Sequence, residues 1–168
     1  MVFVGFAAIV VVRAGHGLRM NGPAAETSRQ RAPAREHVNS TQLRVVIVED
    51  SPIIRARLTE SLTEIRNLTI VGQAETEAEA VSILRDGAWD AVILDLQLKS
   101  GTGLGVLKKL REVGRPAHAK VIVFTNYAFP QYRDRSLSFG ADYFFDKSRE
   151  FDRVRDVLTD LASGETAH

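Results

Sequence analysis

Cysteine is absent from this chain of 168 residues. The protein can therefore form neither a disulfide framework nor a thiolate metal site. This composition fits a reducing compartment, and we expect the cytoplasm. Long apolar runs are lacking as well: the run at the start of the chain, Val2 to Val12, covers 11 residues, whereas a transmembrane helix needs about 20. Neither a disulfide-stabilised secreted domain nor a membrane-spanning protein is indicated.

A strong excess of charge of one sign is lacking too, because the formal net charge is only +1. Residues 1–42 have five arginines and two glutamates, whereas the remaining residues have 17 basic and 19 acidic side chains. A domain close to neutrality has no basic patch of the size that nucleic-acid binding needs. We therefore expect no direct contact between the folded domain and nucleic acid.

Residues 1–42 are interpreted as lying outside the folded domain. Residues 13–42 are rich in Arg, Ala, Gly and Pro and have neither helical nor strand periodicity. They form either a disordered tail or a mis-assigned start, with true translation beginning at Met20. A membrane or signal anchor is a third alternative, but a secretory signal has a basic stretch before its apolar run, and here Arg13 follows that run.

From Leu43 onward, short β-branched runs alternate with amphipathic stretches. The apolar runs predict strands at 43–48, 68–72, 91–94, 120–124 and 143–145. The stretches between them predict helices from Ser51-Pro52 to about 65 and over 75–87, 104–113, 129–139 and 151–161. Ala78, Val81 and Leu84 lie on one face of the second helix, and Leu104, Leu107, Leu110 and Val113 mark the third. We expect one α/β domain over 43–164: a flavodoxin-like (βα)5 three-layer sandwich with a five-stranded parallel sheet of order 2-1-3-4-5.

Polar residues follow four of the predicted strands at the point where each strand ends: Glu49, Asp50, Asp95, Thr125 and Lys147. The carboxyl ends of parallel strands share one edge of the sheet, so these side chains should converge. Clustered carboxylates bind hard divalent cations such as Mg²⁺. A carboxylate beside a cation and a lysine can accept a phosphoryl group. The pattern therefore predicts phosphoryl transfer to Asp95, aided by Thr125 and Lys147.

Residues 43–162 resemble a response-regulator receiver domain of the CheY-like superfamily over its whole length. Gly103, eight residues after Asp95, also stands where this family usually has glycine. The segments that carry the resemblance are Val45-Val46-Ile47-Val48-Glu49-Asp50-Ser51, Val92-Ile93-Leu94-Asp95-Leu96, Val123-Phe124-Thr125-Asn126 and Gly140-Ala141-Asp142-Tyr143-Phe144-Phe145-Asp146-Lys147.

The resemblance implies a role for each residue of the site. Asp95 would be the phospho-acceptor, Thr125 the switch hydroxyl, Lys147 the phosphate-contacting cation and Phe144 the switch aromatic. Mg²⁺ would be held by Glu49, Asp50, Asp95 and the backbone carbonyl of Gln97. A bulky Tyr127, two residues after Thr125, would shield the phosphate and give slow-to-moderate autodephosphorylation.

The resemblance also implies the partners. The phosphoryl donor would be a sensor histidine kinase or a histidine phosphotransfer protein. We expect a two-component phosphorelay regulator that signals by protein–protein contact through the face formed by the fourth strand, fourth helix and fifth strand. Since no output segment is recognisable, we expect a single-domain, non-enzymatic switch, as a monomer or a weak phosphorylation-dependent dimer.

Three positions depart from the family pattern, and three other functions are alternatives. Phe144 lacks the hydroxyl of the tyrosine that is more frequent in the family. Lys99 and Ser148 stand where the family commonly has proline. The alternatives are a DNA-binding regulator whose output domain is missing, a binding module that never accepts phosphate, and a phosphoaspartate hydrolase of the haloacid type. The hydrolase would have a second aspartate two residues after the nucleophile, where this chain has Gln97.

Overall fold

The computed structural model describes residues 42–164, so the predictions for residues 1–41 lie outside the described residues. This region contains five β-strands, β1 (Leu43–Val48), β2 (Leu68–Ala74), β3 (Ala91–Leu94), β4 (Lys120–Thr125) and β5 (Tyr143–Asp146). They alternate with five helices, α1 (Pro52–Thr63), α2 (Glu77–Asp86), α3 (Gly103–Val113), α4 (Pro130–Ser138) and α5 (Phe151–Ser163). All strand pairs are parallel and the order is β2-β1-β3-β4-β5, which confirms the predicted flavodoxin-like topology.

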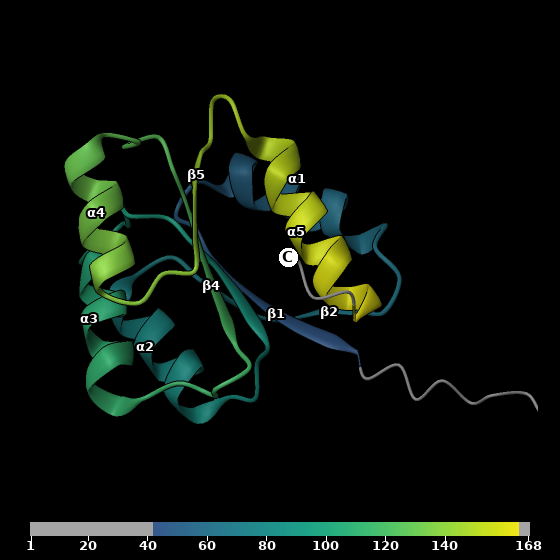
Figure 1. Cartoon of the computed structure of the whole chain (residues 1–168), viewed down its shortest axis with the longest axis horizontal. Coiled ribbons are helices and arrows are strands. Elements are labelled where there is room, and N and C mark those ends of the chain that lie inside the picture. Colours follow the sequence, from purple (N-terminus) through teal and green to yellow (C-terminus); the bar gives the residue numbers. More distant parts are fainter. Residues whose placement is uncertain (1–41, 165–168) are drawn as a thin grey trace, which may run out of the picture. The chain divides into compact units, whose positions relative to one another are not determined.

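The domain has three layers, with helices on both faces of the twisted sheet (Figure 1). Side chains of α1 and α5 pack on one face, against alternate strand residues such as Ile47, Ile93 and Ile122. Side chains of α2 and α3 pack on the other face, against the intervening residues such as Val48 and Val123. Both faces are covered, which explains why the strands read as nearly continuous apolar runs.

Local signals in the sequence account for the helix starts. Ser51 accepts a hydrogen bond from the amide of Ile54, and Pro52 occupies the first turn of α1. At α2, Thr76 and Glu79 form a capping box, in which the side chain of each residue accepts a hydrogen bond from the backbone amide of the other. These caps place the first turn of each helix directly after the carboxyl end of a strand.

Two predicted helix faces were wrong at individual residues. Ala78 is exposed, and α2 buries Ala80 and Leu84 instead. Val113 is 56% exposed at the end of α3. Both predictions assumed that an apolar side chain points to the sheet, but the position of a helix on the sheet decides which of its residues are covered. The predicted limits of the strands and helices differ from the observed ones by at most two residues. Among the described residues, no helix is long and apolar enough to cross a membrane.

Candidate functional site

A lysine and two carboxylates meet at the carboxyl edge of the sheet. The ammonium of Lys147, directly after β5, lies 2.6 Å from Oδ2 of Asp95 and 2.5 Å from Oε2 of Glu49. The side chains of Lys147 and Asp95 are each only 6% exposed, and that of Glu49 is 2% exposed. Three residues that follow three different strands thus form one buried, charged cluster. Their positions after the ends of parallel strands predicted this convergence.

Asp50 adds a third carboxylate to this cluster. Glu49, Asp50 and Asp95 each offer one oxygen, and these three atoms lie within 4.8 Å of one another. Oxygen atoms of carboxylates are the donors that Mg²⁺ prefers, and Mg²⁺ usually keeps several waters beside one or two such ligands. The donor set therefore fits a hard divalent cation.

Burial raises the pKa of the Glu49 carboxyl above its ordinary value. The ion pair with Lys147 acts in the opposite direction but is outweighed, and repulsion from Asp95 adds to the increase. The amide of Ser51 donates a hydrogen bond of 3.1 Å to Oε1 of Glu49. Glu49 is therefore a buried carboxylate that receives positive charge from Lys147 and a hydrogen bond from the backbone.

Thr125 ends β4 beside this cluster and is fully buried. Its hydroxyl oxygen accepts a hydrogen bond of 3.2 Å from the amide of Tyr127. Phe144, the predicted switch aromatic, is buried too, at 5% exposure, and packs in the core on the α2–α4 side of the sheet. The guanidinium carbon of Arg133 in α4 lies 5.7 Å from the centre of its ring. Phe144 thus couples the strand next to Thr125 to α4 by direct packing.

The loop between β3 and α3 is tightly folded around Asp95. The amide of Gln97 donates to Oδ1 of Asp95 at 3.3 Å, and the amide of Gly103 donates to the carbonyl of Leu96 at 2.9 Å. A Cβ atom at Gly103 would collide with the carbonyl oxygen of Asp95. Gly103 therefore has a steric cause here, because the start of α3 approaches the backbone of Asp95 too closely for any side chain.

The loop after Lys147 is held by local hydrogen bonds in place of the missing proline. Both the amide and the hydroxyl of Ser148 donate to Oδ1 of Asp146, at 2.8 and 2.6 Å. These bonds lower the pKa of the Asp146 carboxyl below its ordinary value. The amide of Asp146 in turn donates to Glu150 at 3.0 Å. Ser148 therefore keeps the turn that presents Lys147 ordered without a ring.

The family model for the response regulator receiver domain matches residues 45–159. The chain belongs to this family. Over 123 residues, 73% of the chain, the receiver domain is 28% identical to YvfU of Bacillus subtilis, named an uncharacterized transcriptional regulatory protein, of which it covers 60%. The chain spans about three fifths or less of such curated relatives.

Two solved structures resemble the receiver domain. The receiver domain of the response regulator NarL from Mycobacterium tuberculosis has a TM-score of 0.65 at 24% identity, with 73% of this chain and 98% of that one covered. The CheX–CheY–BeF3–Mg complex of Borrelia burgdorferi has a TM-score of 0.59 at 26% identity, with 69% and 89% covered. Both similarities support the receiver fold.

Arg55 of the receiver domain contacts the site but was not among the predicted residues. From the first turn of α1, one of its nitrogens donates to the carbonyl of Glu49 at 2.8 Å, and another pairs with Glu75 at 2.8 Å. The interaction ties the ends of β1 and β2 together. The sequence offered only the weak indication that an arginine one turn after Ser51 faces the strand ends.

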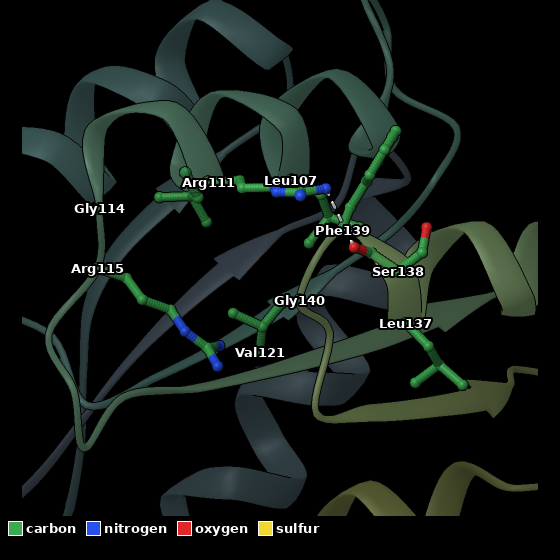
Figure 2. A pocket seen from close by; sticks show the side chains of 10 residues that line it. Leu107, Arg111, Gly114, Arg115, Val121, Leu137, Ser138, Phe139 and Gly140 are labelled. Carbon is green, nitrogen blue, oxygen red and sulfur yellow. Dashed lines mark hydrogen bonds between the residues drawn. The ribbon is translucent and has the colours of Figure 1, made fainter.

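A groove at the opposite edge of the receiver domain has no comparable cluster of charged residues among its lining residues. It has a volume of about 390 Å³ and lies between the C-terminal ends of α3 and α4. Figure 2 shows side chains of both helices around it, with a hydrogen bond from Arg111 to the carbonyl of Ser138. Its second arginine, Arg115, is paired with Asp142 at 2.7 Å. The groove begins where β4 begins, so it is separated from Asp95 by the length of a strand.

Proposed function

We propose that this receiver domain accepts a phosphoryl group on Asp95 from a phosphohistidine of a sensor kinase or of a histidine phosphotransfer protein. The observation that carries the proposal is the contact of Lys147 with both Asp95 and Glu49 inside a cluster of three carboxylates. A buried lysine beside the acceptor carboxylate can stabilise the charge of an incoming phosphoryl group.

In the proposed transfer, a carboxylate oxygen of Asp95 attacks phosphorus. The new oxygen–phosphorus bond makes an acyl phosphate, while the phosphorus–nitrogen bond breaks and the histidine nitrogen keeps the electron pair. Lys147 exchanges its contact with Asp95 for one with the phosphoryl oxygens. The hydroxyl of Thr125 is free to donate to the phosphate, because in the structure it acts as an acceptor from Tyr127.

Glu49, Asp50, Asp95 and the carbonyl of Gln97 would hold Mg²⁺ for this reaction. When bound, the cation screens the carboxylates and neutralises charge on the phosphoryl oxygens. The similar CheY of Borrelia burgdorferi was solved with BeF3 and Mg, and this supports the same cofactor here.

The signal would leave the domain through β4, α4 and β5. Phosphate adds roughly −1.5 to −2 charges at Asp95, which draws Thr125 and Lys147 toward it. Phe144 lies in β5, which pairs with β4, and packs against Arg133 of α4, so a shift of Thr125 at the end of β4 would change the packing of α4. We propose a cytoplasmic, single-domain phosphorelay switch with no catalytic activity beyond its own phosphorylation and dephosphorylation, acting on a protein partner as a monomer or weak dimer.

A second candidate is a DNA-binding regulator whose output domain is not part of this chain. It is favoured by YvfU, which is named a transcriptional regulatory protein and of which the chain covers 60%. Phosphorylation would then promote dimerisation of receiver domains rather than recruit a separate partner. The two candidates share the chemistry of Asp95 and differ only in the output.

Intact mass after incubation with Mg²⁺ and acetyl phosphate tests the shared chemistry. We expect the wild type to gain one phosphoryl group, the Asp95→Asn variant to gain none, and a control variant of an exposed aspartate in α4, Asp134→Asn, to behave as wild type. A wild type without the gain, or an unchanged gain in Asp95→Asn, rejects the proposal. Light scattering of the phosphorylated chain, alone and with cell proteins retained by it, then separates dimerisation from recruitment.

A further inference from the structure

The loop between β3 and α3 pairs with the segment that precedes α2. The amide of Lys99 donates to the carbonyl of Glu75 at 3.1 Å, and the amide of Glu77 donates to the carbonyl of Ser100 at 2.9 Å. Thr76 and Ser100 form an isolated parallel bridge between these bonds. The loop is thus held along its outer side as if it were a short strand, and α2 and α3 lie side by side behind it (Figure 1).

The side chain of Glu77 adds a contact at the start of α3. Its Oε2 accepts a hydrogen bond of 2.8 Å from the amide of Thr102, the residue that caps α3. The hydroxyl of Thr102 accepts from the amide of Gly105 at 3.0 Å. A carboxylate at the N-terminal end of a helix is stabilised by the unpaired amides and by the helix dipole. One carboxylate from α2 therefore completes the cap of α3.

Two glycines leave the space that this carboxylate occupies. A Cβ atom at Gly101 or at Gly105 would collide with the side chain of Glu77. Gly101 also has φ of +78°, a conformation that favours glycine. The carboxylate of Glu77, which is partly exposed, therefore lies between two glycines that leave room for it.

The loop that Glu77 holds carries the acceptor and one predicted metal ligand. Gln97 and Thr102 form an antiparallel bridge across the loop, so fixing Thr102 also fixes the backbone of Gln97. The amide of Gln97 in turn contacts Asp95. Lys99, in the same loop, stands where the family commonly has proline, so the ring that would stiffen this loop is missing. The hydrogen bonds to residues 75–77 restrain the backbone of this loop instead.

We propose that Glu77 is a positioning residue of the phosphorylation site. This role rests on the proposed function. Glu77 holds Thr102, and Thr102 holds the backbone of Gln97. The carbonyl of Gln97 is thereby kept where it would complete the ligands of Mg²⁺. Glu77 itself contacts neither cation nor phosphate. Loss of its carboxylate should therefore weaken cation binding without removing any ligand.

The role of Glu77 can be tested by calorimetric titration with Mg²⁺. The proteins compared are the wild type, Glu77→Ala, Glu77→Gln and a control variant. The control is Asp90→Ala, which removes a hydrogen-bonded carboxylate at the opposite edge of the sheet. We expect Glu77→Ala to raise the dissociation constant of Mg²⁺ about tenfold, the lower limit for residues that orient metal ligands. Glu77→Gln keeps an acceptor for Thr102 and should recover most of the affinity, while Asp90→Ala should lower stability and leave the affinity unchanged.

A double-mutant cycle with Gly105→Ala tests the fitted carboxylate directly. In the wild-type background the new methyl group displaces Glu77, so Mg²⁺ affinity should fall as in Glu77→Ala. In the Glu77→Ala background the same change meets no carboxylate and should have no further effect. Additive effects, an unchanged affinity in Glu77→Ala, or a wild type that binds no Mg²⁺ would each overturn the inference. Because the titration needs no phosphoryl donor, failure of Asp95 to accept phosphate is a separate result.

Discussion

The ammonium of Lys147 lies 2.6 Å from Oδ2 of Asp95, although the two residues are 52 positions apart in the chain. Both side chains are almost fully buried, and Glu49 contacts the same ammonium. Lys147 therefore supplies positive charge to two carboxylates that share a buried site. The residue that is proposed to contact phosphate is also the counter-charge of the site before phosphorylation.

Replacement of this lysine should destabilise the protein in a manner that depends on Mg²⁺. Removal of one partner from a buried ion pair costs about 3–5 kcal/mol of unfolding free energy, because it leaves uncompensated charge. In Lys147→Met, Mg²⁺ would supply the missing positive charge, so added Mg²⁺ should stabilise the variant more than the wild type. Urea unfolding with and without Mg²⁺, followed by the fluorescence of the buried Trp89, measures both effects.

The matched control for this prediction is Lys109→Met on α3. Its ammonium lies 3.0 Å from Glu112, but its side chain is 53% exposed, and exposed pairs contribute little to stability. Equal stabilisation by Mg²⁺ in Lys147→Met and the wild type would contradict the role of Lys147 as counter-charge.

Tyr127 should lengthen the lifetime of the phosphate. Its amide contacts the hydroxyl of Thr125, and its side chain lines a cavity of about 260 Å³ together with Gln97. The residue is 40% exposed and its ring packs edge-on against that of Tyr132, with 6.2 Å between the ring centres, so its side chain lies beside the loop that follows Asp95. In Tyr127→Ala we expect water to reach the acyl phosphate more easily and the phosphate half-life to fall severalfold.

The lifetime is measured as the decay of the phosphorylated mass after the donor is removed. Phe129→Ala is the control, because Phe129 is also exposed and packs near Tyr132, but does not line the cavity that Tyr127 shares with Gln97. Equal half-lives in Tyr127→Ala and wild type, or equal shortening in both variants, would argue against shielding.

The convergence of Asp95 and Lys147 could be predicted because each directly follows a buried apolar run, and parallel strands end at one edge. The cap of α3 by Glu77 could not, because it joins the starts of two helices, and their distance depends on how α2 lies beside α3. The exposed Ala78 was mispredicted for the same reason. Strand ends are determined by local pattern and topology, whereas contacts between helices and loops depend on packing that a single sequence does not display.

Ser136 is the one buried side chain in the described part of the chain whose hydroxyl has no hydrogen-bond partner. It is also the only residue that α4 buries fully. Burial of a hydroxyl without a partner costs about 1–3 kcal/mol of unfolding free energy. An apolar residue at this position would therefore attach α4 to the core more firmly than Ser136 does. We expect Ser136→Ala to raise the unfolding free energy by about 1 kcal/mol and to slow hydrogen exchange in α4.

The control is Ser138→Ala, because the hydroxyl of Ser138 is exposed and donates to the carbonyl of Arg135. A lower stability of Ser136→Ala than of the wild type would show that the hydroxyl of Ser136 has a partner in solution.

Asp90 should make the stability of the domain sensitive to acid. Its carboxylate accepts from the amide, Nε and Nη2 of Arg44 at 2.8–2.9 Å and contacts Nε2 of His118 at 2.9 Å. The bonds from Arg44 are the main cause that holds the pKa of the Asp90 carboxyl well below its ordinary value.

A group with a depressed folded-state pKa stabilises the protein above its unfolded pKa, here about 3.9, and loses that contribution as the pH falls toward the folded value. Asp90→Asn should therefore lower the unfolding free energy by about 2 kcal/mol at neutral pH, the order expected for hydrogen bonds to a charged group. The difference between the variant and the wild type should shrink as the pH falls below about 4. Asp86→Asn, which removes an exposed partner of Arg85, is the control and should give a curve parallel to that of wild type. Urea unfolding between neutral and acidic pH measures the three curves, and a difference between Asp90→Asn and wild type that stays constant with pH would show that Asp90 acts through packing and not through its charge.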